Sequence, residues 1–217
     1  TTSSDIGRLA GQMGIGLKTT VPFLGTVSGQ YVPKTDGTKN ADNAASGDAN
    51  ALVGSGVEVG IKTSLGDLPV VGSYLGNLSL TTGYAEQETA TVTNTTDRTE
   101  ATAALTGSFG NFSFGYQKDF VDEGQTAALT DADFYKIEQI GLAYAINDAL
   151  SISYNTMEQS QHNIDADSSF EQDTTAINIG YTVGGMTIGF QDASTDNANM
   201  VRDAKDDVRS ISVSVAF

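Results

Sequence analysis

Along most of this chain, large apolar side chains alternate with small or polar ones. In MGIGLKT, for example, Met13, Ile15 and Leu17 share one parity, whereas glycines and a lysine share the other. Successive side chains of a β-strand point to opposite faces, so this two-residue period predicts strands, and helical spacing fits none of these segments. We predict eleven strands, at residues 12–20, 24–33, 55–65, 77–92, 98–109, 111–120, 133–146, 149–160, 174–183, 186–195 and 206–217.

The connections between these segments alternate between short and long. Gly110-Asn111, Asn147-Asp148 and Gly184-Gly185 suit tight hairpins, VPFLG near Pro22 forms a fourth turn, and 65–76 forms a longer fifth. Long polar segments separate these hairpins and hold most of the acidic residues; they include 121–133, 161–173 and 192–207. Short turns at one end of the strands and long loops at the other are typical of a transmembrane barrel.

The two faces of the predicted strands differ in a way that favours a membrane. One face carries Gly, Ser, Thr, Ala and Asn, which suits the lumen of a barrel, and the other carries aliphatic residues with Tyr and Phe, which suits lipid. The absence of Trp weakens the case for aromatic girdles. We therefore predict an all-β fold, a transmembrane antiparallel up-and-down β-barrel, with residues 1–217 in one barrel domain. A soluble β-sandwich would instead turn the small residues toward solvent.

Composition excludes several other classes. The chain has 217 residues and a formal net charge of -16, and such acidity argues against nucleic acid as a partner, because binding phosphate needs clustered Lys and Arg. The absence of Cys removes disulfides, cysteine-based zinc sites and thiol catalysis. No apolar run approaches the roughly 20 residues of a membrane helix.

The last segment, RSISVSVAF, resembles the closing strand of bacterial outer-membrane barrels. In that family a terminal Phe, preceded by hydrophobic residues at alternating positions, is read by the barrel assembly machinery, and Ile211, Val213, Val215 and Phe217 match this pattern. The alternative is an ordinary terminal strand that ends in Phe.

The hairpin layout from Met13 to Phe217 resembles the later part of a general bacterial porin. The resemblance implies a trimer of sixteen-stranded, water-filled barrels with a constriction loop folded inside. It also implies contact with outer-membrane lipid and lipopolysaccharide, and a C-terminus on the periplasmic side. An odd strand count that begins at the outer side then indicates the C-terminal part of a longer chain that lacks about five strands, because single-chain barrels have even strand numbers. A count wrong by one would instead give a complete ten- or twelve-stranded barrel.

Catalytic and metal-binding signals are weak in this sequence. His162 is the only histidine, in the segment SQHNIDADSS, and Asp165 and Asp167 follow it. A hydrolytic site needs that imidazole beside a nucleophile or an activated water, and a solvated loop histidine is the simpler interpretation. DADSS and DNANMVRDAKDD could offer oxygen ligands to calcium, but neither has EF-hand spacing. We expect a protein that is not an enzyme and has no cofactor.

Charges on the lumen face are the candidate functional residues. Lys18, Glu58 and Lys62 have lumen parity, and a lysine on the lipid face would cost roughly 2–4 kcal/mol at the midplane. Porins place a basic wall opposite the acids of the constriction loop, and the resemblance puts Arg8 just after that loop, where it joins the wall or serves as a rim residue. We expect Lys18, Lys62 and Arg8 to influence ion selectivity more than a loop acid such as Asp42, because exposed charges are screened beyond about 8 Å.

The sequence thus predicts an outer-membrane porin for passive diffusion of ions and small hydrophilic solutes. Two alternatives remain open. One is an outer-membrane barrel enzyme of the protease or phospholipase type, which would need a titratable partner beside His162. The other is a secreted soluble β-sandwich or adhesin.

Overall fold

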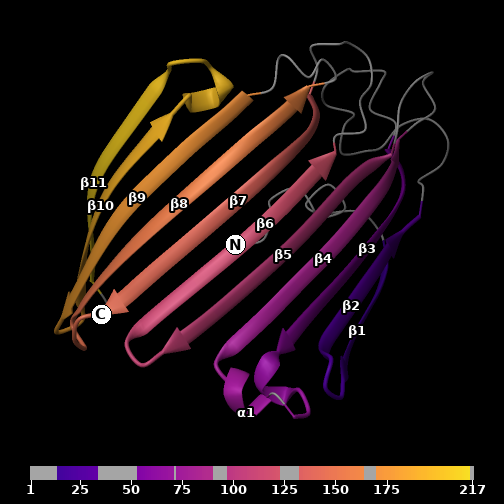
Figure 1. The fold of residues 1–217 in the computed structure, drawn as a ribbon, viewed down its shortest axis with the longest axis horizontal. Helices are drawn as coiled ribbons and strands as arrows, with labels where there is room; N and C mark the ends of the chain where they lie inside the picture. The colour runs from indigo at the N-terminus through magenta and orange to yellow at the C-terminus, as the bar shows by residue number, and fades with distance from the viewer. Residues whose placement is uncertain are drawn as a thin grey trace.

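Eleven antiparallel strands form one curved sheet, in which each strand pairs with its neighbour in sequence (Figure 1). The computed structural model describes residues 14–33, 53–70, 72–89, 97–122, 132–163 and 170–215. The strands are β1 Ile15–Val21, β2 Gly25–Val32, β3 Val53–Ser64, β4 Leu78–Thr89, β5 Arg98–Phe109, β6 Phe112–Asp122, β7 Ala132–Ala145, β8 Leu150–Asn163, β9 Phe170–Val183, β10 Met186–Asp196 and β11 Lys205–Val215.

The predicted fold class is confirmed, because every described strand pairs up-and-down with its neighbours. The sheet is not closed in the part that the structure describes: β1 and β11 each pair on one side only. The helical elements are short, namely η3 Leu65–Asp67, α1 Gly72–Leu75 and η5 Ala198–Met200. None of the described helices is long and apolar enough to cross a membrane.

The short turns form for reasons that are local in the sequence. Gly184 and Gly185 both have positive φ, at 54° and 83°, as a two-residue turn between twisted antiparallel strands requires. Between β7 and β8, Asn147 Oδ1 accepts hydrogen bonds from the backbone N–H groups of Ala149 and Leu150, at 2.9 and 3.0 Å. Asn side chains stabilise turns by bonding the backbone in this way.

Two of the predicted long loops are shorter than expected. Residues 161–163 extend β8 and residues 170–173 begin β9, with Gln161 paired to Phe170. Likewise β10 continues to Asp196 and β11 begins at Lys205. The polar composition of these segments predicts loops, but strands that project beyond an apolar belt can be polar on both faces.

The packing is that of a single layer and has almost no enclosed core. Among the described residues, only four apolar side chains are buried, those of Val32, Ala85, Val121 and Ala198. A soluble sandwich would bury one face of each sheet against the other, and the described residues include no second sheet. The soluble alternative therefore does not match this architecture.

Candidate functional site

The register of the sheet divides its side chains into a polar face and an apolar face. Directly paired residues lie on the same face, so the polar face can be followed from Lys18 through Ser28, Gly60, Gly83 and Thr102 to Asp119. The small and amide side chains of β8–β11 continue this face; examples are Ser153, Asn178, Gln191 and Ser210.

The opposite face exposes a belt of large apolar side chains. Ile140, Leu142, Ile177 and Ile179 are 38–45% exposed although each lies in the middle of a paired strand. Above the belt, Lys118 pairs with Glu138 at 3.2 Å and Lys205 with Asp196 at 2.8 Å. On β10 and β11 charges begin lower, because Asp192, which lies opposite Ile177, pairs with Arg209 at 2.7 Å.

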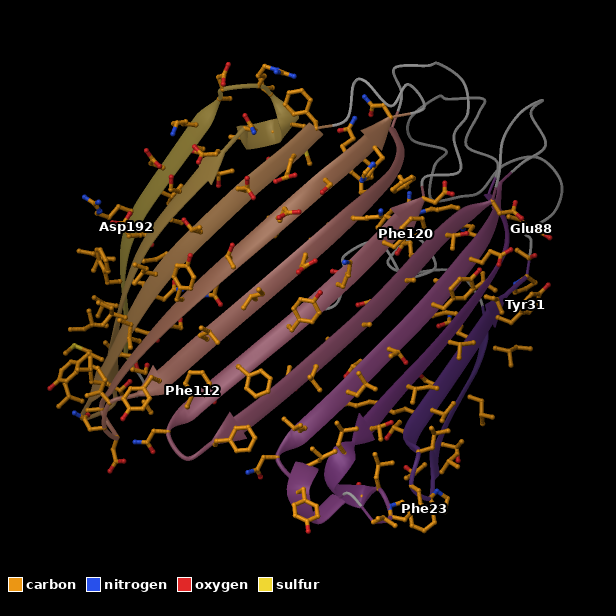
Figure 2. The ribbon with its side chains drawn as sticks, in the orientation of Figure 1. Phe23, Tyr31, Glu88, Phe112, Phe120 and Asp192 are labelled. Carbon is orange, nitrogen blue, oxygen red and sulfur yellow. The ribbon has the colours of Figure 1, made fainter. Side chains whose placement is uncertain are left out.

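Figure 2 shows aromatic residues at both ends of β6, with Phe112 toward the short turns and Phe120 toward the long connections. On the apolar face, the ring of Phe120 lies 5.4 Å from that of Phe134. An apolar band bounded by aromatic and charged residues is the surface that a bilayer requires.

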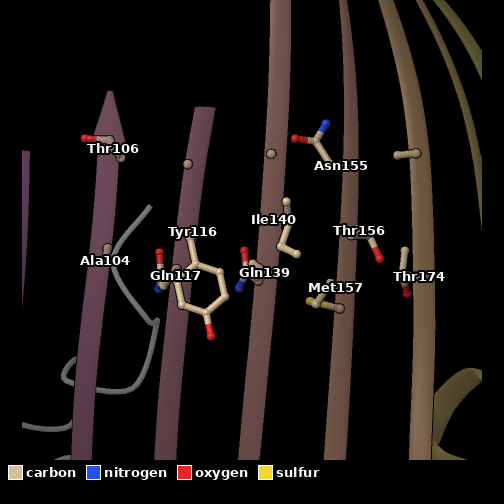
Figure 3. Close-up of a pocket in the computed structure, with 13 residues that line it drawn as sticks. Ala104, Thr106, Tyr116, Gln117, Gln139, Ile140, Asn155, Thr156, Met157 and Thr174 are labelled. Atoms are coloured by element: carbon tan, nitrogen blue, oxygen red, sulfur yellow. The ribbon is translucent and has the colours of Figure 1, made fainter. Parts of the chain in front are cut away.

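Two shallow hollows open on the polar face. The first has a volume of ≈ 320 Å³ and spans β5 to β9; Figure 3 shows Gln117, Gln139 and Asn155 around it, each from a different strand. The second, of ≈ 310 Å³, lies over β8–β11 and is lined mainly by Ser and Asn side chains. Hydroxyl and amide groups of this kind can hydrogen-bond water or hydrophilic solutes without fixing a charged partner.

The predicted lumen charges are spread along β1 and β3. Lys18, Glu58 and Lys62 all lie on the polar face; both lysines are exposed and Glu58 is half-buried. No pair among these three is joined by an ion pair, and Arg8 lies outside the described residues. Their role in a pore stays a prediction.

A more compact group of charges lies on the same face of β5 and β6 and was missed in the sequence analysis. Arg98, Glu100 and Asp119 are only 5%, 6% and 4% exposed. Arg98 binds Glu100 through Nη2 at 2.7 Å and Nε at 2.8 Å, and Gln117 donates to both oxygens of Asp119. Parity along 98–109 and 111–120 places these residues on the polar face, because Arg98 and Glu100 alternate with Thr99 and Ala101, but parity does not show that they are buried together.

The prediction that His162 lies in a loop is wrong. His162 belongs to β8, where it pairs with Phe134, and the two rings stack with centroids 4.4 Å apart. Lys136 Nζ lies 5.1 Å from the Phe134 ring. The histidine thus packs against an aromatic ring on the outer face, while Asp165 and Asp167 lie outside the described residues.

One carboxylate cluster could hold a cation. Glu158, Glu171 and Asp173 each offer an oxygen within 4.8 Å of the others, and all three are exposed on the apolar face above the belt. Exposed acidic groups often cluster without a metal, and the calcium predicted for the acidic loops remains untested.

The residues of the predicted C-terminal assembly pattern lie on β11. Ile211, Val213 and Val215 are exposed on its outer face, while Phe217 lies outside the described residues.

Comparisons with known proteins identify the fold but no family. No protein family matches the sequence, and no curated protein matches it either. Two solved structures of OmpT, an in-vitro folded outer membrane protein of Vibrio cholerae, match with TM-scores of 0.54 and 0.53 at 12% and 11% identity, the second in a trimer form. Each match covers 92% of this chain, which spans 60% and 61% of the two OmpT chains. The chain therefore has the fold of an outer-membrane β-barrel protein.

The prediction that the chain is not an enzyme is wrong as it stood. The likeness to OmpT identifies an outer-membrane barrel fold, and such barrels include proteases and phospholipases as well as channels. A fold of this kind does not decide between them. A sequence with a single histidine says nothing of carboxylate chemistry, so an enzyme has to be considered beside a channel.

Proposed function

We propose that this chain forms part of the wall of a water-filled outer-membrane pore for passive diffusion of ions and small hydrophilic solutes. The observation that carries the proposal is the division of one sheet into a polar, hollowed face and an exposed apolar face. In water, an apolar surface of this extent would drive association. In lipid, the same surface is the favourable one, and the polar face is then free to line water.

Several finer features of the proposal come from the resemblance to general porins. We propose a homotrimer, contact with lipopolysaccharide at the long-connection end, and recognition of Ile211, Val213, Val215 and Phe217 by the assembly machinery. β1 and β11 run in the same direction, and among the described strands each has one unpaired edge, which a bilayer does not tolerate. Further strands that complete a larger, even-stranded barrel would pair with both edges.

The pore proposal predicts electrical conductance. Full-length protein inserted into planar bilayers should give stepwise currents that rise in proportion to salt concentration, because ions would cross in bulk-like water. Heat-denatured protein is the control and should give no steps. Folded protein, verified by its heat-modifiable gel mobility, that never conducts would contradict the proposal.

A barrel enzyme is the second candidate, and one observation favours it. The carboxylate oxygens of Glu158, Glu171 and Asp173 converge within 4.8 Å, and paired carboxyl groups can act as general acid and base. His162 lies diagonally across from Glu171, because Ser160 is the direct partner of Glu171. Hydrolysis of a peptide or a phospholipid that is lost in Glu171→Gln would establish this candidate, whereas hydrolysis unchanged in that variant would remove the cluster from consideration.

The proposed orientation predicts which residues a reagent outside the cell can reach. The chain has no cysteine, so single cysteines report their own positions. Val201→Cys, in the connection between β10 and β11, should react on intact cells with a bulky, membrane-impermeant maleimide. Asp148→Cys, in the turn between β7 and β8, should react only after the outer membrane is opened. Labelling in the reverse order would mean that the C-terminus faces outward.

A further inference from the structure

We propose that Asp119, together with Glu100 and Glu58, makes the β3–β6 part of the polar face a cation-attracting wall. The inference rests on the proposed pore and goes beyond it, because it names the residues that set ion preference. The resemblance to porins led us to expect a basic wall, whereas the buried charges found here are mainly acidic.

Asp119 is the centre of this group. Its side chain is buried, at 4% exposure, and its two oxygens accept hydrogen bonds of 3.0 and 2.9 Å from Gln117 Nε2. In the part of the chain that the structure describes, no Lys, Arg or His forms an ion pair with Asp119. A buried charge is normally paired, so this carboxylate would attract a mobile cation.

Glu100 adds a second carboxylate, and the hydrogen bonding of that carboxylate is incomplete. Its Oε1 accepts both contacts from Arg98, while Oε2 is buried without a hydrogen-bond partner among the residues that the structure describes. Gln87, which pairs directly with Arg98, is 7% exposed, and its Nε2 also lacks a partner. Within the described part of the chain, Glu100 Oε2 and Gln87 Nε2 thus lie on neighbouring strands without hydrogen bonds. A hydrated cation could supply the missing partners.

The register brings the three carboxylates into one patch. Glu58 and Glu100 flank Ala85 in one row across β3, β4 and β5. Asp119 pairs with Thr102, two residues along β5 from Glu100 on the same face, so Asp119 and Glu100 are diagonal neighbours whose Cα atoms lie roughly 7–8 Å apart. Arg98 is the single cation among them, which leaves an excess of negative charge.

The lysines on the polar face do not cancel this field. Lys18 lies about 24 Å along the sheet from Asp119, in the same register row, and roughly 12 Å from Glu58, two strands and two residues away, at about 4.8 Å per strand. Both separations exceed the screening length of about 8 Å at physiological salt. Lys18 and Lys62 are also exposed to solvent, which screens their charges. Glu100 and Asp119 are buried beside the low-dielectric wall, where a charge acts over a longer range.

The test is the reversal potential of full-length protein in planar bilayers under a potassium chloride gradient. Asp119→Asn keeps the shape of the side chain and removes its charge, and the ratio of potassium to chloride permeability should fall by about twofold or more. Glu58→Gln should shift the ratio in the same direction by less. Asp192→Asn is the matched control, because Asp192 lies on the opposite face and pairs with Arg209 at 2.7 Å; its ratio should equal that of the wild type.

The outcomes separate this inference from the pore proposal. A wild type that is folded but does not conduct overturns the pore and, with it, the premise of the inference. Conducting Asp119→Asn channels with an unchanged permeability ratio overturn the inference and leave the pore intact. If Asp119→Asn does not fold, Glu58→Gln provides the test, because Glu58 is only half-buried. An unchanged ratio of potassium to chloride permeability in conducting Glu58→Gln channels then overturns the cation-attracting wall.

Discussion

Replacing Ile179 with Lys should strongly destabilise the folded protein in lipid, so that it unfolds at a lower urea concentration than the wild type. Ile179 lies on the apolar face of β9, between Ile152 on β8 and Phe190 on β10. A lysine in that belt costs about 2–4 kcal/mol, which lowers the ratio of folded to unfolded protein roughly 30- to 700-fold. The measurement is refolding of the full-length protein from urea into lipid vesicles, followed by heat-modifiable gel mobility.

The neighbouring residue supplies the control. Asn178 is adjacent in sequence but lies on the polar face, where its Nδ2 donates a 3.4 Å hydrogen bond to Ser153. Asn178→Lys introduces the same charge on the same strand, and it should fold nearly as well as the wild type because its ammonium group would stay in water. Equal losses in the two variants would mean that both faces meet the same solvent, and the barrel interpretation would fail.

The strands could be predicted because burial by lipid imposes the same two-residue period on each of them. Ile177, Ile179 and Tyr181 are apolar at every second position, and all their partners across β8 and β10 follow the same rule except Asp192, which lies opposite Ile177. The tight turns could be predicted for a similar reason. Gly184 and Gly185 adopt the positive φ angles that few other residues tolerate.

The ends of the strands could not be predicted from the same signal. Above the apolar belt, Gln161 and Phe170 still pair, but no lipid contact requires their outward neighbours to be apolar. The period therefore disappears while the backbone hydrogen bonding continues. His162 was assigned to a loop for this reason, although it lies in β8 and stacks on Phe134.

The charged patch was missed because its importance depends on burial and on partners from other strands. Arg98, Glu100 and Asp119 have lumen parity, as many polar residues here do, and nothing local distinguishes them from Lys18 or Lys62. What distinguishes them is that they are almost fully buried, and that Asp119 is held by an amide and not by a cation. Neither property can be read from spacing along one strand.

A second large effect is expected at the turn between β1 and β2, where Gly25 has φ +85°. A Cβ atom at this position would lie 2.2 Å from the backbone oxygen of Lys62 and 3.0 Å from the Cα of Thr63. The hydroxyl of Thr63 donates a 2.6 Å hydrogen bond to the carbonyl of Leu24, which holds β3 against this turn. Neither backbone can therefore move away without breaking pairing between β2 and β3.

Gly25→Ala should accordingly destabilise the barrel more than an ordinary glycine substitution in a turn. Positive φ costs a non-glycine residue about 1–2 kcal/mol, and forcing an atom into packed surroundings adds about 1–3 kcal/mol. Gly110→Ala separates the two costs, because Gly110 has φ +58° but no atom within 4 Å of the added Cβ. Urea midpoints of the two variants refolded in the same vesicles should differ, with Gly25→Ala unfolding at the lower concentration. Equal midpoints would show that the contact with Lys62 relaxes without cost, and that only the turn conformation matters at this end of the sheet.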